Sequence, residues 1–220
     1  MIDVKTKAKT DLNLPAGHVV TDWTRDGKLL TTTVSGTDSA SAKVRMHLLN
    51  LDGTVHKALA EDSNVLAGRA SPDGTRVLCV RLAVREATRG EKAACEKEGA
   101  NLQDYLQHWP TVIDLLIERT SGGPVAGFVP ETELVVVDVA TGKVSRVARL
   151  AMDASVAGGF CWSPGGEQIA YICYTPRSDH GFDDHLIVCD PDGANAKVLQ
   201  SKAGDSRWNR HEILGGLDWR

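Results

Sequence analysis

The densest group of side chains able to do chemistry lies in the segment PRSDHGFDDH, residues 176–185. Carboxylate oxygens and imidazole nitrogens at close range are ligands that a divalent metal ion takes in proteins. The spacing matches no known ligand signature, and Gly181 is typical of a loop tip, so a solvated loop without metal is the alternative. The candidate ligands are Asp179, His180, Asp183, Asp184 and His185.

A second polar segment, KAGDSRWNRHEILGG, precedes the last residues of the chain. Tryptophan and arginine together are typical of the few residues that dominate a protein interface. We therefore expect a partner-binding platform here, with the alternative that Trp208 packs over the rim of the domain. The candidate contacts are Arg207, Trp208, Arg210 and His211.

Residues 86–131 carry a third candidate. The segment EATRGEKAACEKEGANLQDYLQHWP is charged and rich in alanine, and its apolar residues follow a helical spacing. The next segment, TVIDLLIERT, continues as a helix or, alternatively, forms a β-strand. A partly helical insertion would act as a lid or a docking surface, or it would be a passive elaboration. The helical apolar stripe consists of Leu102, Tyr105, Leu106 and Trp109, of which Tyr105 and Trp109 are candidate partner contacts.

The sequence gives little support for catalysis. It contains no Gly-x-Ser-x-Gly elbow and no glycine-rich phosphate loop, and its seven histidines are scattered. Five cysteines without a C-x-x-C pair disfavour a zinc site. We expect no catalytic residue and no cofactor in this chain.

Composition narrows the partners further. The net charge is −4 and the sequence has no cluster of Lys and Arg, so it does not predict a surface that binds nucleic acid. No apolar run approaches the roughly 20 residues of a membrane span. The compartment stays open: cytoplasmic if Met1 is the true start, periplasmic if a signal peptide precedes it.

A repeated sequence phrase predicts the strands that position these three candidate segments. The sequences WTRDG, ASPDG and WSPGG, beginning at Trp23, Ala70 and Trp162, are versions of one phrase, and a short apolar strand follows each. A fourth copy starts at Leu217 and reaches the chain end at Arg220.

The second half of each unit is an apolar strand, a glycine turn and a more polar strand. Gly53, Gly142 and Gly193 mark these turns, where positive φ favours tight antiparallel reversals. The sequence of each unit therefore predicts four antiparallel strands, which we call A to D in chain order. Units of about 40–45 residues have the period of a propeller blade.

The segments ASPDGTRVLCV and CWSPGGEQIAYICY resemble the repeats of TolB-like β-propellers, also described as WD-like repeats. The resemblance covers nearly the whole chain except residues 86–131 and implies an all-β propeller of four-stranded antiparallel blades. Departures are Thr24-Arg25 in place of Ser-Pro and Gly165 in place of Asp. The family includes TolB proteins and propeller domains of prolyl-oligopeptidase-like peptidases.

We expect one domain over residues 1–220, with three full blades and a closing blade shared between the chain ends. MIDVKT resembles strand C, AKTDLN resembles strand D, and Leu214–Arg220 would supply strand A. Strand B is missing from this set. The chain is therefore a four-bladed ring with an incomplete blade or, as we favour, the C-terminal part of a longer protein.

The expected function is a non-catalytic scaffold that binds a protein or peptide partner on its loop face, where the B–C and D–A connections gather. One alternative is the gating propeller of a prolyl-oligopeptidase-like peptidase. A second is a small-molecule or metal-binding propeller that uses residues 176–185. The oligomeric state is left open.

Overall fold

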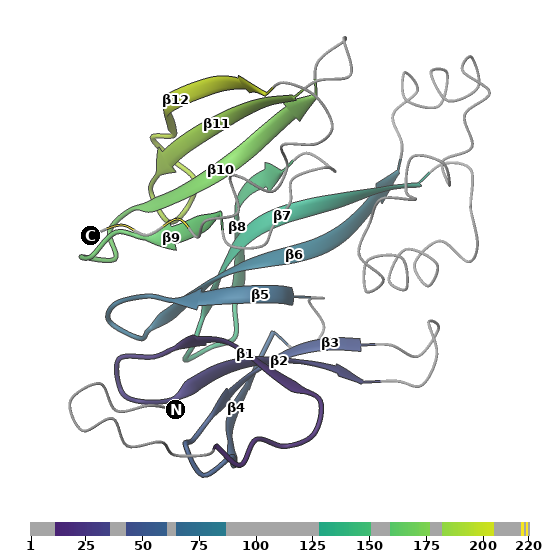
Figure 1. The fold of residues 1–220 in the computed structure, drawn as a ribbon, viewed down its shortest axis with the longest axis vertical. Coiled ribbons are helices and arrows are strands. Elements are labelled where there is room, and N and C mark those ends of the chain that lie inside the picture. Colours follow the sequence, from purple (N-terminus) through teal and green to yellow (C-terminus); the bar gives the residue numbers. More distant parts are fainter. Residues whose placement is uncertain are drawn as a thin grey trace.

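The computed structural model describes residues 12–35, 43–60, 65–86, 128–150, 159–176, 182–204, 217 and 219. Every regular element among them is a β-strand, and the strands form three antiparallel four-stranded sheets (Figure 1). The all-β, antiparallel prediction is therefore confirmed. The expected helices of residues 86–131 and most of the proposed closing blade lie outside the described residues.

Within each sheet the strands follow chain order, so each sheet is a simple meander. The first sheet contains β1 (His18–Trp23), β2 (Leu29–Ser35), β3 (Lys43–Leu49) and β4 (Val55–Leu59). The second contains β5 (Val65–Ala70), β6 (Arg76–Glu86), β7 (Phe128–Asp138) and β8 (Val144–Leu150). The third contains β9 (Phe160–Trp162), β10 (Ile169–Pro176), β11 (Phe182–Cys189) and β12 (Lys197–Gly204). These sheets are the three four-strand units that the repeat predicts.

The turn between the first two strands is built alike in every sheet. A hydroxyl at its start accepts a hydrogen bond from the backbone N–H that re-enters the sheet, which helps to close the turn locally. The donor–acceptor pairs are Lys28 N to Thr24 Oγ1 at 2.9 Å, Arg76 N to Ser71 Oγ at 2.9 Å and Gln168 N to Ser163 Oγ at 3.0 Å. These hydroxyls are part of the turn structure, as expected from the sequence.

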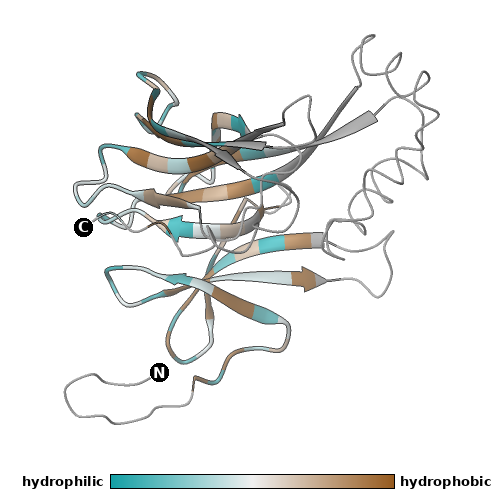
Figure 2. Ribbon diagram, turned by 45° about the horizontal axis from the view of Figure 1, so that its top comes forward, coloured by the Kyte–Doolittle hydropathy of each residue, from teal (hydrophilic) through white to brown (hydrophobic). Residues whose placement is uncertain are grey.

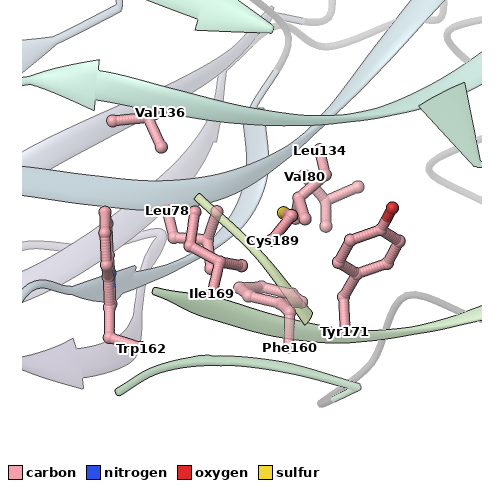
Figure 3. Close-up of a cluster of buried hydrophobic side chains, with 9 residues drawn as sticks. All are labelled: Leu78, Val80, Leu134, Val136, Phe160, Trp162, Ile169, Tyr171 and Cys189. Carbon is pink, nitrogen blue, oxygen red and sulfur yellow. The ribbon is translucent and has the colours of Figure 1, made fainter. Parts of the chain in front are cut away.

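Two hydrophobic clusters hold the sheets together, one on each face of the second sheet. Because side chains alternate along a strand, Val77 and Cys79 face the first sheet, while Leu78 and Val80 face the third. This double burial explains why residues 77–80 of β6 are all apolar. Figure 3 shows the cluster between the second and third sheets, and Figure 2 shows hydrophobic residues along the strands and hydrophilic ones at many turns.

Strands β6 and β7 are longer than the other strands and extend together beyond the sheet (Figure 1). Their pairing is regular from Arg76 opposite Asp138 to Glu86 opposite Phe128. Residues 128–131, the last part of the expected insertion, therefore belong to paired strand. The remainder of the insertion begins and ends at the tip of this two-stranded ribbon.

Candidate functional site

Most of the predicted site residues lie outside the described residues, and their roles remain predictions. This holds for the partner-binding candidates Tyr105, Trp109, Arg207, Trp208, Arg210 and His211. It also holds for two of the candidate metal ligands, Asp179 and His180.

The remaining metal candidates lie at the start of β11. Asp184 and His185 are adjacent in the strand, so their side chains point to opposite faces of the sheet. His185 Nδ1 lies 2.8 Å from Ser201 Oγ on β12. Asp183 pairs across the sheet with Thr175 and Ala203. Among the described residues, no group of three or more His, Cys, Asp or Glu is placed to hold a metal ion.

The base of the β6–β7 ribbon holds a buried carboxylate that sequence reasoning missed. Glu133 is 4% exposed, and it lies opposite Arg81 in the strand pairing. The Arg81 guanidinium donates two hydrogen bonds to Glu133 Oε2, one of them from Nε at 3.0 Å. Arg146 of β8 donates from Nη1 to Glu133 Oε1 at 3.4 Å. We call these three residues the arginine–glutamate group.

The arginine–glutamate group carries a local excess of positive charge, because two guanidinium groups share one carboxylate. Both oxygens of the Glu133 carboxylate accept hydrogen bonds from guanidinium groups. The side chain of Arg146 is 51% exposed and that of Arg81 is 28% exposed. Their remaining N–H donors can bind a carboxylate or backbone carbonyl of a partner.

A second polar group lies on the first sheet, on the face turned away from the second sheet. His18 Nδ1 lies 2.9 Å from Thr31 Oγ1, and His47 Nε2 lies 3.3 Å from Thr33 Oγ1. The two imidazole rings are tilted, with centroids 5.1 Å apart. Burial lowers the pKa of His18, so the folded protein favours its neutral form. This arrangement stabilises the strand pairing and contains no nucleophile.

Two of the described thiols, those of Cys79 and Cys189, are also poor candidates for chemistry. Complete burial raises the pKa of the Cys79 thiol, and burial raises the pKa of Cys189 to about 11. Because the thiolate is the reactive form, both cysteines behave as small apolar residues of the core. The described part of the chain also contains no helix able to cross a membrane.

Comparison with known proteins finds likeness in structure only. No family model matches the chain, and no curated protein matches it. A solved candidate TolB from Agrobacterium tumefaciens is 16% identical with a TM-score of 0.46, and the match covers 88% of this chain and 52% of the TolB chain. The acylaminoacyl peptidase of Pyrococcus horikoshii is 14% identical with a TM-score of 0.48, covering 85% of this chain and 25% of the peptidase.

The chain thus spans about half the length of the TolB structure and a quarter of the peptidase. A TolB structure is among those that the chain resembles, as the repeats predicted. These likenesses concern the fold and assign no activity to the chain.

Proposed function

We propose that this protein is a non-catalytic β-propeller module that binds a protein or peptide through its loop face. The observation that carries the proposal is the arginine–glutamate group at the base of the β6–β7 ribbon. It places a half-exposed arginine beside a rigid two-stranded support, away from the turns that join the first two strands of each sheet. Arginine is one of the residues that most often dominate binding energy at interfaces.

The chemistry of the group points to the kind of peptide. Glu133 holds Arg81 and Arg146 in place, and the guanidinium N–H groups that do not contact Glu133 can donate to a partner's acceptor. A carboxylate matches the geometry of a guanidinium and can form two parallel hydrogen bonds with it. The expected partner is therefore a peptide with an acidic residue, bound next to the residues that the ribbon carries.

The test is selection of peptides from a displayed library on the immobilised full-length chain, followed by affinity measurements in solution. We expect enriched peptides to contain Asp or Glu and to lose about tenfold in affinity with Arg146→Ala, equivalent to about 1.4 kcal/mol. Arg25→Ala is the matched control, because Arg25 is an exposed arginine in the turn between β1 and β2.

Two results would overturn the proposal. One is that no selected peptide binds in solution. The other is that Arg146→Ala and Arg25→Ala bind the selected peptides equally well. Measurement of the unfolding midpoint of both variants would exclude a general loss of structure as the cause of weaker binding.

A further inference from the structure

Four turns of the chain contain the sequence Asp–Gly, which is open to a spontaneous covalent change because glycine has no side chain to shield its backbone nitrogen. That nitrogen can attack Cγ of the aspartate, so that an N–Cγ bond forms, a Cγ–O bond breaks and water leaves, which gives a succinimide ring. Water then opens the ring and leaves either aspartate or isoaspartate, whose main chain runs through the side-chain carboxyl carbon. The four sequences are Asp26-Gly27, Asp52-Gly53, Asp73-Gly74 and Asp192-Gly193.

Each of these turns holds the attacking nitrogen in a hydrogen bond. The glycine N–H donates to the carbonyl oxygen of the residue three positions earlier, at 2.8–3.0 Å in all four turns. Succinimide formation therefore requires the turn to open, and its rate depends on the fraction of molecules in which that turn is open. Because the nitrogen is held alike in the four turns, we expect their rates to differ through the hydrogen bonds of the aspartate carboxylates.

In three of the turns, side chains of the same turn donate hydrogen bonds to the aspartate carboxylate. These bonds favour the ionised carboxylate and lower the pKa of all three aspartates. An ionised carboxylate reacts poorly, because its oxygen leaves as water only after it has taken up a proton. The same bonds also oppose opening of the turn. The donors are Lys28 and Thr24 to Asp26, Thr54 to Asp52, and Ser71 and Thr75 to Asp73.

The turn between β11 and β12 lacks such a donor. Ala194 follows Gly193 where threonine, Thr54 or Thr75, follows the glycine of two other turns. Among the described residues, the exposed carboxylate of Asp192 accepts one hydrogen bond, from the backbone N–H of Ala194 at 2.9 Å. Asp192 is therefore the aspartate of the four that its own turn holds least.

This turn also has little room for a longer backbone. A Cβ atom built on Gly193 would lie 2.2 Å from the carbonyl oxygen of Val147 and 3.4 Å from its Cα atom. The turn of the third sheet thus lies directly against β8 of the second sheet. Isoaspartate adds one carbon atom to the main chain immediately before Gly193, so the glycine cannot keep its position against Val147.

We propose that Asp192-Gly193 is the first of the four Asp–Gly sequences to isomerise to isoaspartate, and that this change weakens the contact between the third and second sheets. Water is the only other reactant. The reaction does not involve the arginine–glutamate group or a bound peptide, so this proposal and the proposed function can fail separately.

The test is incubation of the folded full-length protein near neutral pH, followed by digestion and mass spectrometry with a fragmentation method that distinguishes isoaspartate from aspartate. We expect isoaspartate to accumulate at Asp192 about fivefold faster than at Asp73, the effect that one net hydrogen bond has on the open fraction of a turn. Short peptides with the four turn sequences are the control. They should isomerise at similar rates, because no folded turn holds them.

Two variants exchange the residue that distinguishes the turns. Ala194→Thr should slow isomerisation at Asp192 and leave the rate at Asp52 unchanged, whereas Thr75→Ala should accelerate isomerisation at Asp73. The purified form with isoaspartate at residue 192 should melt at a lower temperature than the unmodified protein.

Isomerisation at any of the other three sites as fast as at Asp192 would overturn the proposal. An unchanged rate in Ala194→Thr would also overturn it, as would peptides that isomerise in the same order as the folded protein, because the sequence and not the turn would then set the rates. An unchanged melting temperature of the isoaspartate form would refute the effect on the contact between the sheets.

Discussion

Trp23 and Trp162 have the same residue type, the same repeat position and the same strand pairing, yet one is half-exposed and the other is buried. The difference comes from the neighbouring sheet and not from the sheet that carries the tryptophan. In this architecture a sheet provides apolar side chains on both faces, but each face becomes core only when the next sheet packs against it.

The largest expected effect is the difference in unfolding free energy between replacing Trp162 and replacing Trp23 with alanine. Trp162→Ala removes a buried side chain, its hydrogen bond to Arg69 and its contact with Arg76, so we expect it to cost about 3–5 kcal/mol of unfolding free energy. Trp23→Ala should cost less than about 1 kcal/mol, as is usual for exposed positions. Urea denaturation of both variants measures the difference, and similar costs would show that Trp23 is buried in solution.

The second comparison concerns glycines in the turns between the third and fourth strands. Gly193, Gly53 and Gly142 all have positive φ, so alanine at any of them costs about 1–2 kcal/mol. A Cβ at Gly193 or Gly53 would also collide with a backbone carbonyl, whereas a Cβ at Gly142 would meet nothing within 4 Å. We expect Gly193→Ala and Gly53→Ala to cost about 3 kcal/mol by adding the overpacking penalty.

Gly142→Ala is the control, because it measures the cost of placing alanine at positive φ without a collision of its Cβ. If Gly53→Ala costs no more than Gly142→Ala in thermal or chemical unfolding, Asn13 does not stand over Gly53.

A smaller effect is expected at Arg76, which joins the second sheet to the third. Arg76→Ala removes the contact with the Trp162 ring and the hydrogen bond to Gly166, and we expect a loss of about 1–2 kcal/mol. Arg76→Lys should recover only part of it, because lysine lacks the planar guanidinium. The equivalent change in the first sheet, Lys28→Ala, should have a smaller effect on the denaturation midpoint. Equal losses at both positions would contradict the contact.

The smallest expected effect is the dependence of stability on pH at the turn that contains Asp73, which the equivalent turn of the third sheet should lack. The Ser71 hydroxyl and the Thr75 backbone N–H donate to Asp73 and lower its pKa to about 2. Because the unfolded chain binds the proton more readily, the stabilisation is present above the ordinary pKa of 3.8 and is lost as pH falls towards 2. The equivalent position in the third sheet is Gly165, which cannot titrate.

We therefore expect the difference in melting temperature between the unmodified protein and Asp73→Asn to shrink between about pH 5 and about pH 2. Circular dichroism follows both transitions. Asp73 is largely exposed, so the difference should be modest. A constant difference over this range would show that the carboxylate does not take part in the turn.

The repeated phrases predicted the strand order because each contains a turn with a local mechanism. Ser71, Gly74 and Gly193 define where strands begin and end without reference to distant residues. The two apolar faces of β6 also follow from the four consecutive apolar residues at 77–80. These features depend on short stretches of chain, so the sequence alone reveals them.

The arginine–glutamate group and the exposure of Trp23 depend on contacts between distant segments. Arg81 and Glu133 meet only because β6 and β7 pair across the residues between them, and no local pattern sets that register. Trp23 looked like a copy of Trp162 in sequence, but its exposure depends on whether another sheet packs against it. The six candidates at Tyr105, Trp109 and residues 207–211 lie outside the described residues and remain predictions.

The most direct test is hydroxyl-radical footprinting of the full-length protein, with oxidation of Trp23 and Trp162 quantified separately by mass spectrometry. The account predicts that Trp23 is oxidised several times faster than Trp162 in the folded protein. It also predicts that the two rates become equal in urea. Equal rates in the folded protein, or faster oxidation of Trp162, would contradict the claim that Trp23 is half-exposed where Trp162 is buried.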